Sequence, residues 1–111
     1  VHSQKTFDPT ILGGDYSYRI IPSDINMKSL KEVHRSNLFD HEGIRGNPST
    51  GLPIPQLNAL VKEGYIEKIN YRHISIMGSI TAPTRFIKNT IPDIVKYLKE
   101  DHVDVILLVP V

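Results

Sequence analysis

The stretch Asp104-Val105-Ile106-Leu107-Leu108-Val109-Pro110-Val111 decides the fold class that the sequence predicts. It is a short and almost uninterrupted apolar run, which is typical of a strand buried on both faces of a parallel sheet. A second run rich in isoleucine, His73 to Gly78, precedes it. An amphipathic helix between the two runs would complete a right-handed βαβ unit. We therefore expect an α/β fold with a mostly parallel sheet and flanking helices.

The helix between the two runs is predicted by apolar residues at helical spacing, namely Ile87, Ile91, Ile94, Val95 and Leu98. Pro92 is compatible with the first helical turn if Thr90 is the N-cap, and Asp93 then completes a capping box. These signals predict a short turn near Thr84 to Lys88 and a helix from about Ile91 to Glu100.

The other segments give weaker signals. Tyr16 to Ile21 alternates large apolar and polar residues and is expected to form a strand. The density of glycine and proline from Phe39 to Pro55 predicts an extended loop, and a short amphipathic helix is expected from Pro55 to Gly64. Tyr65 to Asn70 and His73 to Ser79 read as two more strands, and Leu30 to Ser36 stays ambiguous.

Composition bounds the classes of function. The 111 residues carry 13 basic and 12 acidic side chains, and 40% are hydrophobic, so a single globular domain over residues 1–111 is expected. The near-neutral charge argues against nucleic-acid binding, and no apolar run is long enough to cross a bilayer. A cytoplasmic protein is the default expectation. The chain has no cysteine, which excludes disulfides, thiolate metal sites and cysteine nucleophiles within it.

Both ends of the sequence suggest an incomplete, truncated domain. The chain starts with Val1 and shows no signal-peptide pattern. It stops directly after the apolar run that ends at Val111, without the covering helix that a buried strand requires.

Candidate binding residues begin with Asp15, Ser17 and Arg19, which alternate and therefore share one face of the expected strand. Asp15 and Arg19 can form a solvated salt bridge, or Arg19 can act as a carboxylate clamp. His34, Arg45 and Asn47 bracket the Gly/Pro loop and are candidate donors to the same pocket.

The histidines do not predict a metal site. They are His2, His34, His41, His73 and His102. His34 and His41 meet only if the chain between them folds back, and no second pair has metal-ligand spacing. We therefore interpret them as ordinary surface or core histidines.

A family resemblance rests on the motif Gly14-Asp15-Tyr16-Ser17-Tyr18-Arg19-Ile20-Ile21-Pro22. It resembles the Gly-Asp-x-Ser/Thr-aromatic-Arg-x-Ile-Pro motif of the substrate-specific, selenocysteine-containing B-type subunits of the glycine, sarcosine, betaine and D-proline reductases. The order of the later segments is also similar, from His34 and Asn47 through the His-x-Ser-x-Met-Gly segment at His73 to Gly78. The chain departs from the family at Arg45-Gly46-Asn47, where Asp-x-Asn is usual.

The resemblance implies reductive cleavage of a C–N bond α to a carboxylate. It implies a selenocysteine or cysteine nucleophile directly after Val111, so these residues would contain no catalytic group. It also implies a partner reductase subunit that carries a pyruvoyl group, with no cofactor or metal held by this chain. In that scheme Arg19 binds the carboxylate of a small amino-acid or amine substrate, and His34 and Asn47 orient it.

Two classes of function therefore remain open. The leading hypothesis is a component of a selenol- or thiol-dependent reductase that lacks its nucleophile here and is inactive alone. The alternative is a non-catalytic carboxylate-binding or oligomerising α/β module. In either case a homo-oligomer is expected, because the Val103 to Val109 run and one face of the predicted helix lack cover.

Overall fold

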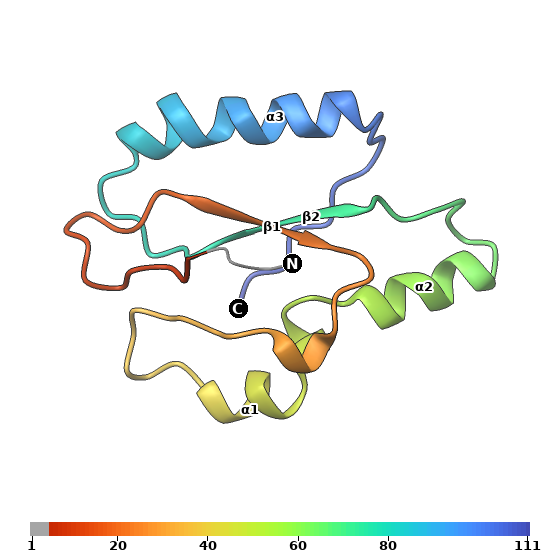
Figure 1. Cartoon of the computed structure of the whole chain (residues 1–111), viewed down its shortest axis with the longest axis horizontal. Helices are drawn as coiled ribbons and strands as arrows, with labels where there is room; N and C mark the ends of the chain where they lie inside the picture. Colours follow the sequence, from red (N-terminus) through yellow and green to blue (C-terminus); the bar gives the residue numbers. More distant parts are fainter. Residues whose placement is uncertain (1–4) are drawn as a thin grey trace.

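A two-stranded antiparallel sheet organises residues 5–111, the part of the chain that this computed structural model describes. Strand β1 spans Tyr18–Pro22 and strand β2 spans Arg72–Ile76. Tyr18 lies opposite Ile76, and Pro22 lies opposite Arg72 (Figure 1). The pairing therefore joins two segments that are far apart in the sequence.

Helices lie on both sides of this sheet (Figure 1). Helix α3, Ile91–Glu100, runs along one side and is preceded by a π-helical turn, Phe86–Thr90. Helices α1, His41–Gly46, and α2, Ile54–Lys62, lie on the other side. Short 3-10 turns occupy Met27–Ser29 and Pro48–Thr50.

The two predicted helices are present, but the start of α3 differs from the prediction. Thr90 has helical backbone angles, and its side chain does not cap the helix. The Thr90 hydroxyl instead donates a hydrogen bond to the carbonyl of Tyr16. The helical path thus continues backward through Phe86–Thr90 and is attached to the segment before β1.

The prediction of an α/β fold with a mostly parallel sheet is wrong. β1 and β2 are antiparallel, and within residues 5–111 they are the only strands. The run from Val103 to Val111 has no regular secondary structure and does not join the ladder, so no βαβ unit forms. The apolar pattern predicts a buried strand, but a strand needs a partner edge, and hydrophobicity does not provide one.

Two local predictions were also wrong. Residues 65–67 form bends and residues 68–70 have no regular secondary structure, so no strand forms there. The region from Phe39 to Pro55 contains α1, where Asp40 accepts a hydrogen bond from the backbone N–H of Gly43 at 2.9 Å. This cap lets a short helix form in spite of its glycines.

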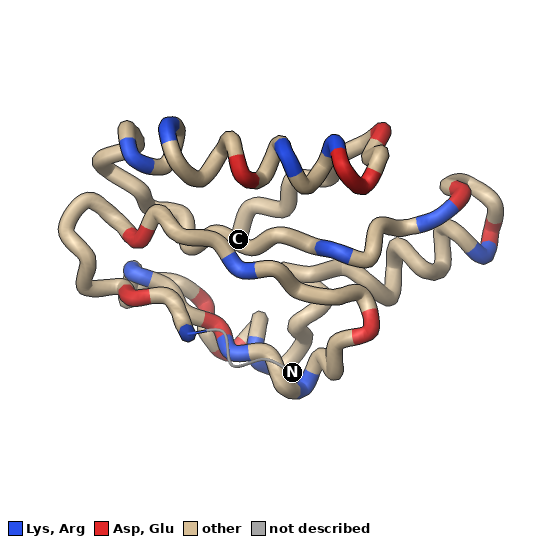
Figure 2. The backbone as a smooth tube through the Cα atoms, turned by 45° about the horizontal axis from the view of Figure 1, so that its top comes forward, with Lys and Arg blue, Asp and Glu red and all other residues tan. Residues whose placement is uncertain are grey.

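The apolar core of the described chain is small. Ile54 and Met77 are its buried hydrophobic residues, whereas Val105 and Leu108 are 84% and 83% exposed. Charged residues of both signs are interspersed along the helices (Figure 2). Among residues 5–111, no helix combines the length and apolar character that a bilayer span requires.

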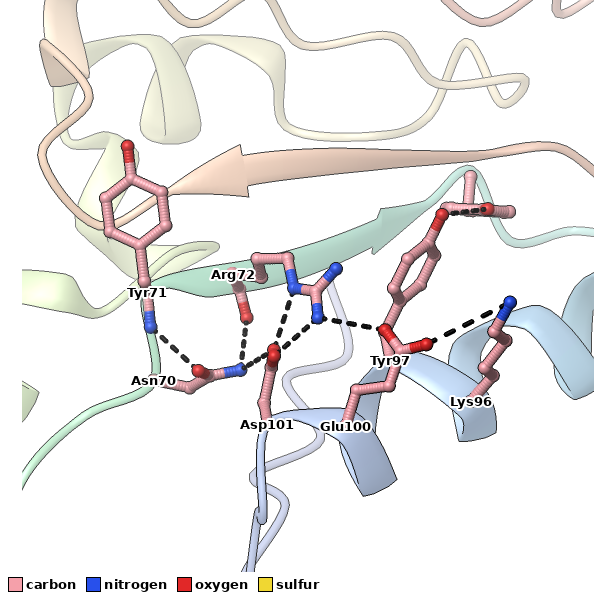
Figure 3. A network of polar contacts seen from close by, with 8 residues as sticks. Asn70, Tyr71, Arg72, Lys96, Tyr97, Glu100 and Asp101 are labelled. Atoms are coloured by element: carbon pink, nitrogen blue, oxygen red, sulfur yellow. Dashed lines mark hydrogen bonds and ion pairs between the residues drawn. The ribbon is translucent and has the colours of Figure 1, made fainter.

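A polar network joins β2 to the end of α3 (Figure 3). The Nε of Arg72 donates to Asp101 at 2.8 Å, and a second guanidinium nitrogen donates to the other carboxylate oxygen. Asn70 also donates to Asp101 at 2.8 Å. The Arg72 guanidinium lies 4.5 Å from the ring centroid of Tyr97. The bidentate ion pair and the ring contact hold the helix against the strand.

Glycines let two loops approach closely at the other end of the sheet. Gly13 and Gly14 have φ angles of +84° and +99°, and a Cβ atom on Gly14 would lie 2.8 Å from the Cα of Ile80. The amide of Ala82 donates to the carbonyl of Gly13 at 3.0 Å. The segments before β1 and after β2 are thereby held together.

Replacing Gly14 with alanine should lower the free energy of unfolding by about 1–3 kcal/mol, because the left-handed backbone and the backbone contact both oppose a side chain. Gly46→Ala is the matched control, since a Cβ there meets nothing within 4 Å. It should leave stability unchanged or raise it by up to about 1 kcal/mol. Urea denaturation measures both, and equal stability of the two variants would contradict the role of Gly14.

The Arg72–Asp101 pair should make stability depend on acid pH. Hydrogen bonds from Arg72 and Asn70 lower the pKa of Asp101 to about 2, below its usual value near 4. Its contribution is therefore fully present above about pH 4 and is lost as the pH falls toward 2. Asp101→Asn should flatten the loss of stability in that window, whereas Asp104→Asn should keep the wild-type profile. Denaturation from pH 6 to pH 2 tests this.

Candidate functional site

Asp15, Ser17 and Arg19 form a hydrogen-bonded relay next to β1. Nη1 of Arg19 donates to the Ser17 hydroxyl at 2.9 Å, and that hydroxyl donates to Asp15. The sequence predicted that Asp15 and Arg19 share a face and can pair across Ser17. In the structure Ser17 connects the two charges.

Asp15 is a buried carboxylate with several donors. It is 6% exposed and accepts backbone N–H bonds from Asp8 and Ser17, each at 2.9 Å. Burial raises its pKa, but the hydrogen bonds from Ser17 and Asp8 outweigh burial and keep the pKa below the usual value. Asp15 thus stays ionised and fixes the turn before β1.

The guanidinium of Arg19 is engaged by the chain itself. It donates to the carbonyl of Tyr18 at 2.8 Å and to the carbonyl of Lys5. It also lies 4.3 Å from the ring centroid of Phe7. These contacts hold the residues before the Gly13-Gly14 turn against β1.

His34 and Asn47 make contacts within their own loops. The His34 ring stacks on Phe39 with centroids 4.2 Å apart, and its Nδ1 accepts the amide of Ser36 at 2.9 Å. The Asn47 side chain accepts from the hydroxyl of Ser49 at 2.6 Å and caps the turn Pro48–Thr50.

The contacts of Arg19, His34 and Asn47 do not show the single pocket that the sequence predicted for them. Within residues 5–111, no hydrogen bond, ion pair or ring contact joins Arg19 to His34 or Asn47. The role of Arg19, His34 and Asn47 in substrate binding stays a prediction.

Sequence reasoning missed a cluster centred on Glu32. Its carboxylate contacts Nδ1 of His41 at 2.9 Å and Nη2 of Arg45 at 2.6 Å. Burial raises the pKa of Glu32, but hydrogen bonds from His41 and Arg45 lower it below the usual value. Arg45, a predicted pocket donor, is thus paired internally. The partners are separated by 9 and 13 residues, a spacing that no helix or strand period indicates.

The remaining histidines have separate surroundings. Nε2 of His73 lies 2.8 Å from the Ser23 hydroxyl, and burial lowers the pKa of His73. His2 lies outside the described residues. Among the residues that the structure does describe, no group of three or more histidine or carboxylate side chains is placed to hold a metal ion.

A pocket of about 400 Å³ lies where the Gly13-Gly14 turn meets the segment before α3. Its walls are mostly apolar, and Arg85 supplies its charge. The lining residues are Ile11, Leu12, Gly13, Gly14, Tyr16, Ala82, Thr84 and Arg85. This volume falls within the range of about 300–1,000 Å³ that is usual for small-molecule sites.

One known protein matches most of this chain in sequence. It is the D-proline reductase subunit gamma of Acetoanaerobium sticklandii, which is 32% identical over 97 residues, or 87% of the chain. The similarity supports the proline and glycine reductase family. It does not distinguish the subunit type, so the B-type assignment stays a prediction.

The match with the D-proline reductase subunit is partial in length. It covers 39% of that protein, so the chain spans about two fifths of the relative. No protein-family model and no solved structure matches the chain.

Replacing Asp15 with alanine should lower the free energy of unfolding by about 1–3 kcal/mol, because Ser17 and two backbone amides lose their acceptor in a buried place. Asp104→Ala, at an exposed aspartate, is the control and should change stability by less than about 0.5 kcal/mol. Thermal and urea unfolding both report the difference. An Asp15 variant as stable as the control would show that the relay is not structural.

Proposed function

We propose that this chain is a component of an amino-acid reductase that cleaves the bond between the α carbon and the nitrogen of a small amino acid. The observation that carries the proposal is the 32% identity with a D-proline reductase subunit over 87% of the chain. D-proline is therefore the first substrate to test, and glycine, sarcosine and betaine follow from the family resemblance.

The 111 residues fit substrate recognition better than the redox step. Reductive C–N cleavage of this type needs a soft nucleophile such as a selenol or thiol, and the chain has no cysteine. We propose that the nucleophile, a selenocysteine or cysteine, comes from outside these residues. A pyruvoyl group on a partner subunit would activate the amine nitrogen. By themselves, residues 1–111 are expected to show no turnover.

Exposed apolar residues support a partner subunit. The C-terminal segment contributes Val105, Ile106, Leu107, Leu108 and Val111, all between 57% and 84% exposed. Ile87 and Val95 on the Phe86–Glu100 helical stretch are also exposed. Apolar surface of this kind favours protein contacts, either with a partner reductase subunit or, as the sequence predicts, with another copy of the chain.

Activity tests the proposal directly. The protein should be isolated from its own cells together with its bound subunits and supplied with a dithiol reductant. We expect D-proline to be reduced to 5-aminopentanoate, the product of opening the ring at the α-carbon–nitrogen bond. Glycine, sarcosine and betaine are assayed in parallel. If none of the four is reduced by a preparation that contains a pyruvoyl-bearing subunit, the reductase assignment is wrong and a non-catalytic module becomes the better description.

A further inference from the structure

Arginines in this chain differ in how far their guanidinium groups are already engaged. Arg19 donates to Ser17 and to two backbone carbonyls, Arg45 pairs with Glu32, and Arg72 pairs with Asp101. A guanidinium that serves internal acceptors has less capacity to bind a ligand.

Arg85 is different because it is exposed and lines the pocket of about 400 Å³. Its contact with the rest of the described chain is a distant one, with the guanidinium carbon 5.9 Å from the ring centroid of Tyr16. No hydrogen bond or ion pair to another residue in 5–111 occupies its donors. Its fork of N–H groups is therefore available to a carboxylate.

The pocket wall around Arg85 is built by the fold. The Ala82 amide bonds to Gly13 at 3.0 Å, and a Cβ on Gly13 would come within 2.8 Å of the Ala82 Cβ. Thr90 in turn anchors the start of α3 to Tyr16. The two segments that carry the apolar lining and Arg85 are thus fixed relative to each other.

We propose that this pocket binds a small carboxylate with an apolar body, and that Arg85 is the residue that pairs with the carboxylate. The apolar ring or chain of the ligand packs on Ile11, Ala82 and Tyr16. The choice of D-proline as the substrate rests on the proposed function. With that substrate, the geometry assigns the carboxylate of D-proline to Arg85 rather than to Arg19.

Binding measurements on the isolated complex test the site without any turnover. The probes are D-proline, cyclopentanecarboxylate and the neutral cyclopentanecarboxamide, titrated by calorimetry. Arg85→Gln should weaken both carboxylates about 10- to 100-fold, the effect of losing a hydrogen bond to a charged group, and leave the amide unchanged. Arg85→Lys should retain part of the affinity. Arg35→Gln, at another exposed arginine that does not line this pocket, is the matched control and should bind like wild type.

Unfolding midpoints should be equal in all three variants, because the Arg85 side chain has little part in the fold. Equal carboxylate affinity of Arg85→Gln and wild type would overturn the proposal, and so would the lack of saturable binding of either carboxylate. A complex that binds carboxylates through Arg85 without reducing D-proline would support the pocket and refute the reductase function. A complex that reduces D-proline with the same KM in Arg85→Gln as in wild type would support the reductase function and refute the pocket.

Discussion

The antiparallel pairing of β1 with β2 is the constraint on which the rest of the structure depends. Its register places the chain before Tyr18 beside the chain after Ile76, and the Gly13-Gly14 turn meets Ile80 and Ala82 there. At the opposite end the amide of Ser23 donates to the carbonyl of Tyr71 at 2.8 Å, next to the network that holds α3. A register shifted by one residue would turn the side chains of one strand to the opposite face relative to its partner, and would separate these contacts.

Local patterns predicted α2 and α3 but missed α1, and they predicted the topology poorly. The apolar spacing and Pro92 indicated α3, and Gly64 marked the end of α2, because both signals act within a few residues. The pairing of β1 with β2 links residues about fifty positions apart, and no local pattern encodes which edge a strand joins. The apolar run from Val103 to Val111 shows the limit, since it has strand composition and no strand partner within residues 5–111.

At the candidate site, too, the sequence predicted local features but not tertiary contacts. The alternation of Asp15, Ser17 and Arg19 predicted one shared strand face, but β1 begins at Tyr18, so Asp15 and Ser17 precede the strand. The three side chains are connected by hydrogen bonds through Ser17. What could not be predicted is that Arg19 donates to Ser17 and to backbone carbonyls. The contacts of Glu32 with His41 and Arg45 could not be predicted either. Whether a charged group is free or engaged depends on tertiary contacts, and the sequence around Arg85 carries no periodic signal that singles it out.

The internal hydrogen bonds also explain how Arg19 and Arg85, which lie near the same turn, can have different roles. Arg19 is held by Ser17, and Ser17 is held by the buried carboxylate of Asp15, so moving Arg19 toward a ligand would break hydrogen bonds that are partly buried. Such a displacement costs about 1–3 kcal/mol for each buried group left without a partner. Arg85 meets a ligand without that loss. The turn held by Asp15 also forms, through Gly13 and Gly14, the wall of the pocket beside Arg85. The hydrogen bonds of Asp15 and Arg19 therefore fix the backbone of the pocket in which Arg85 can bind a ligand.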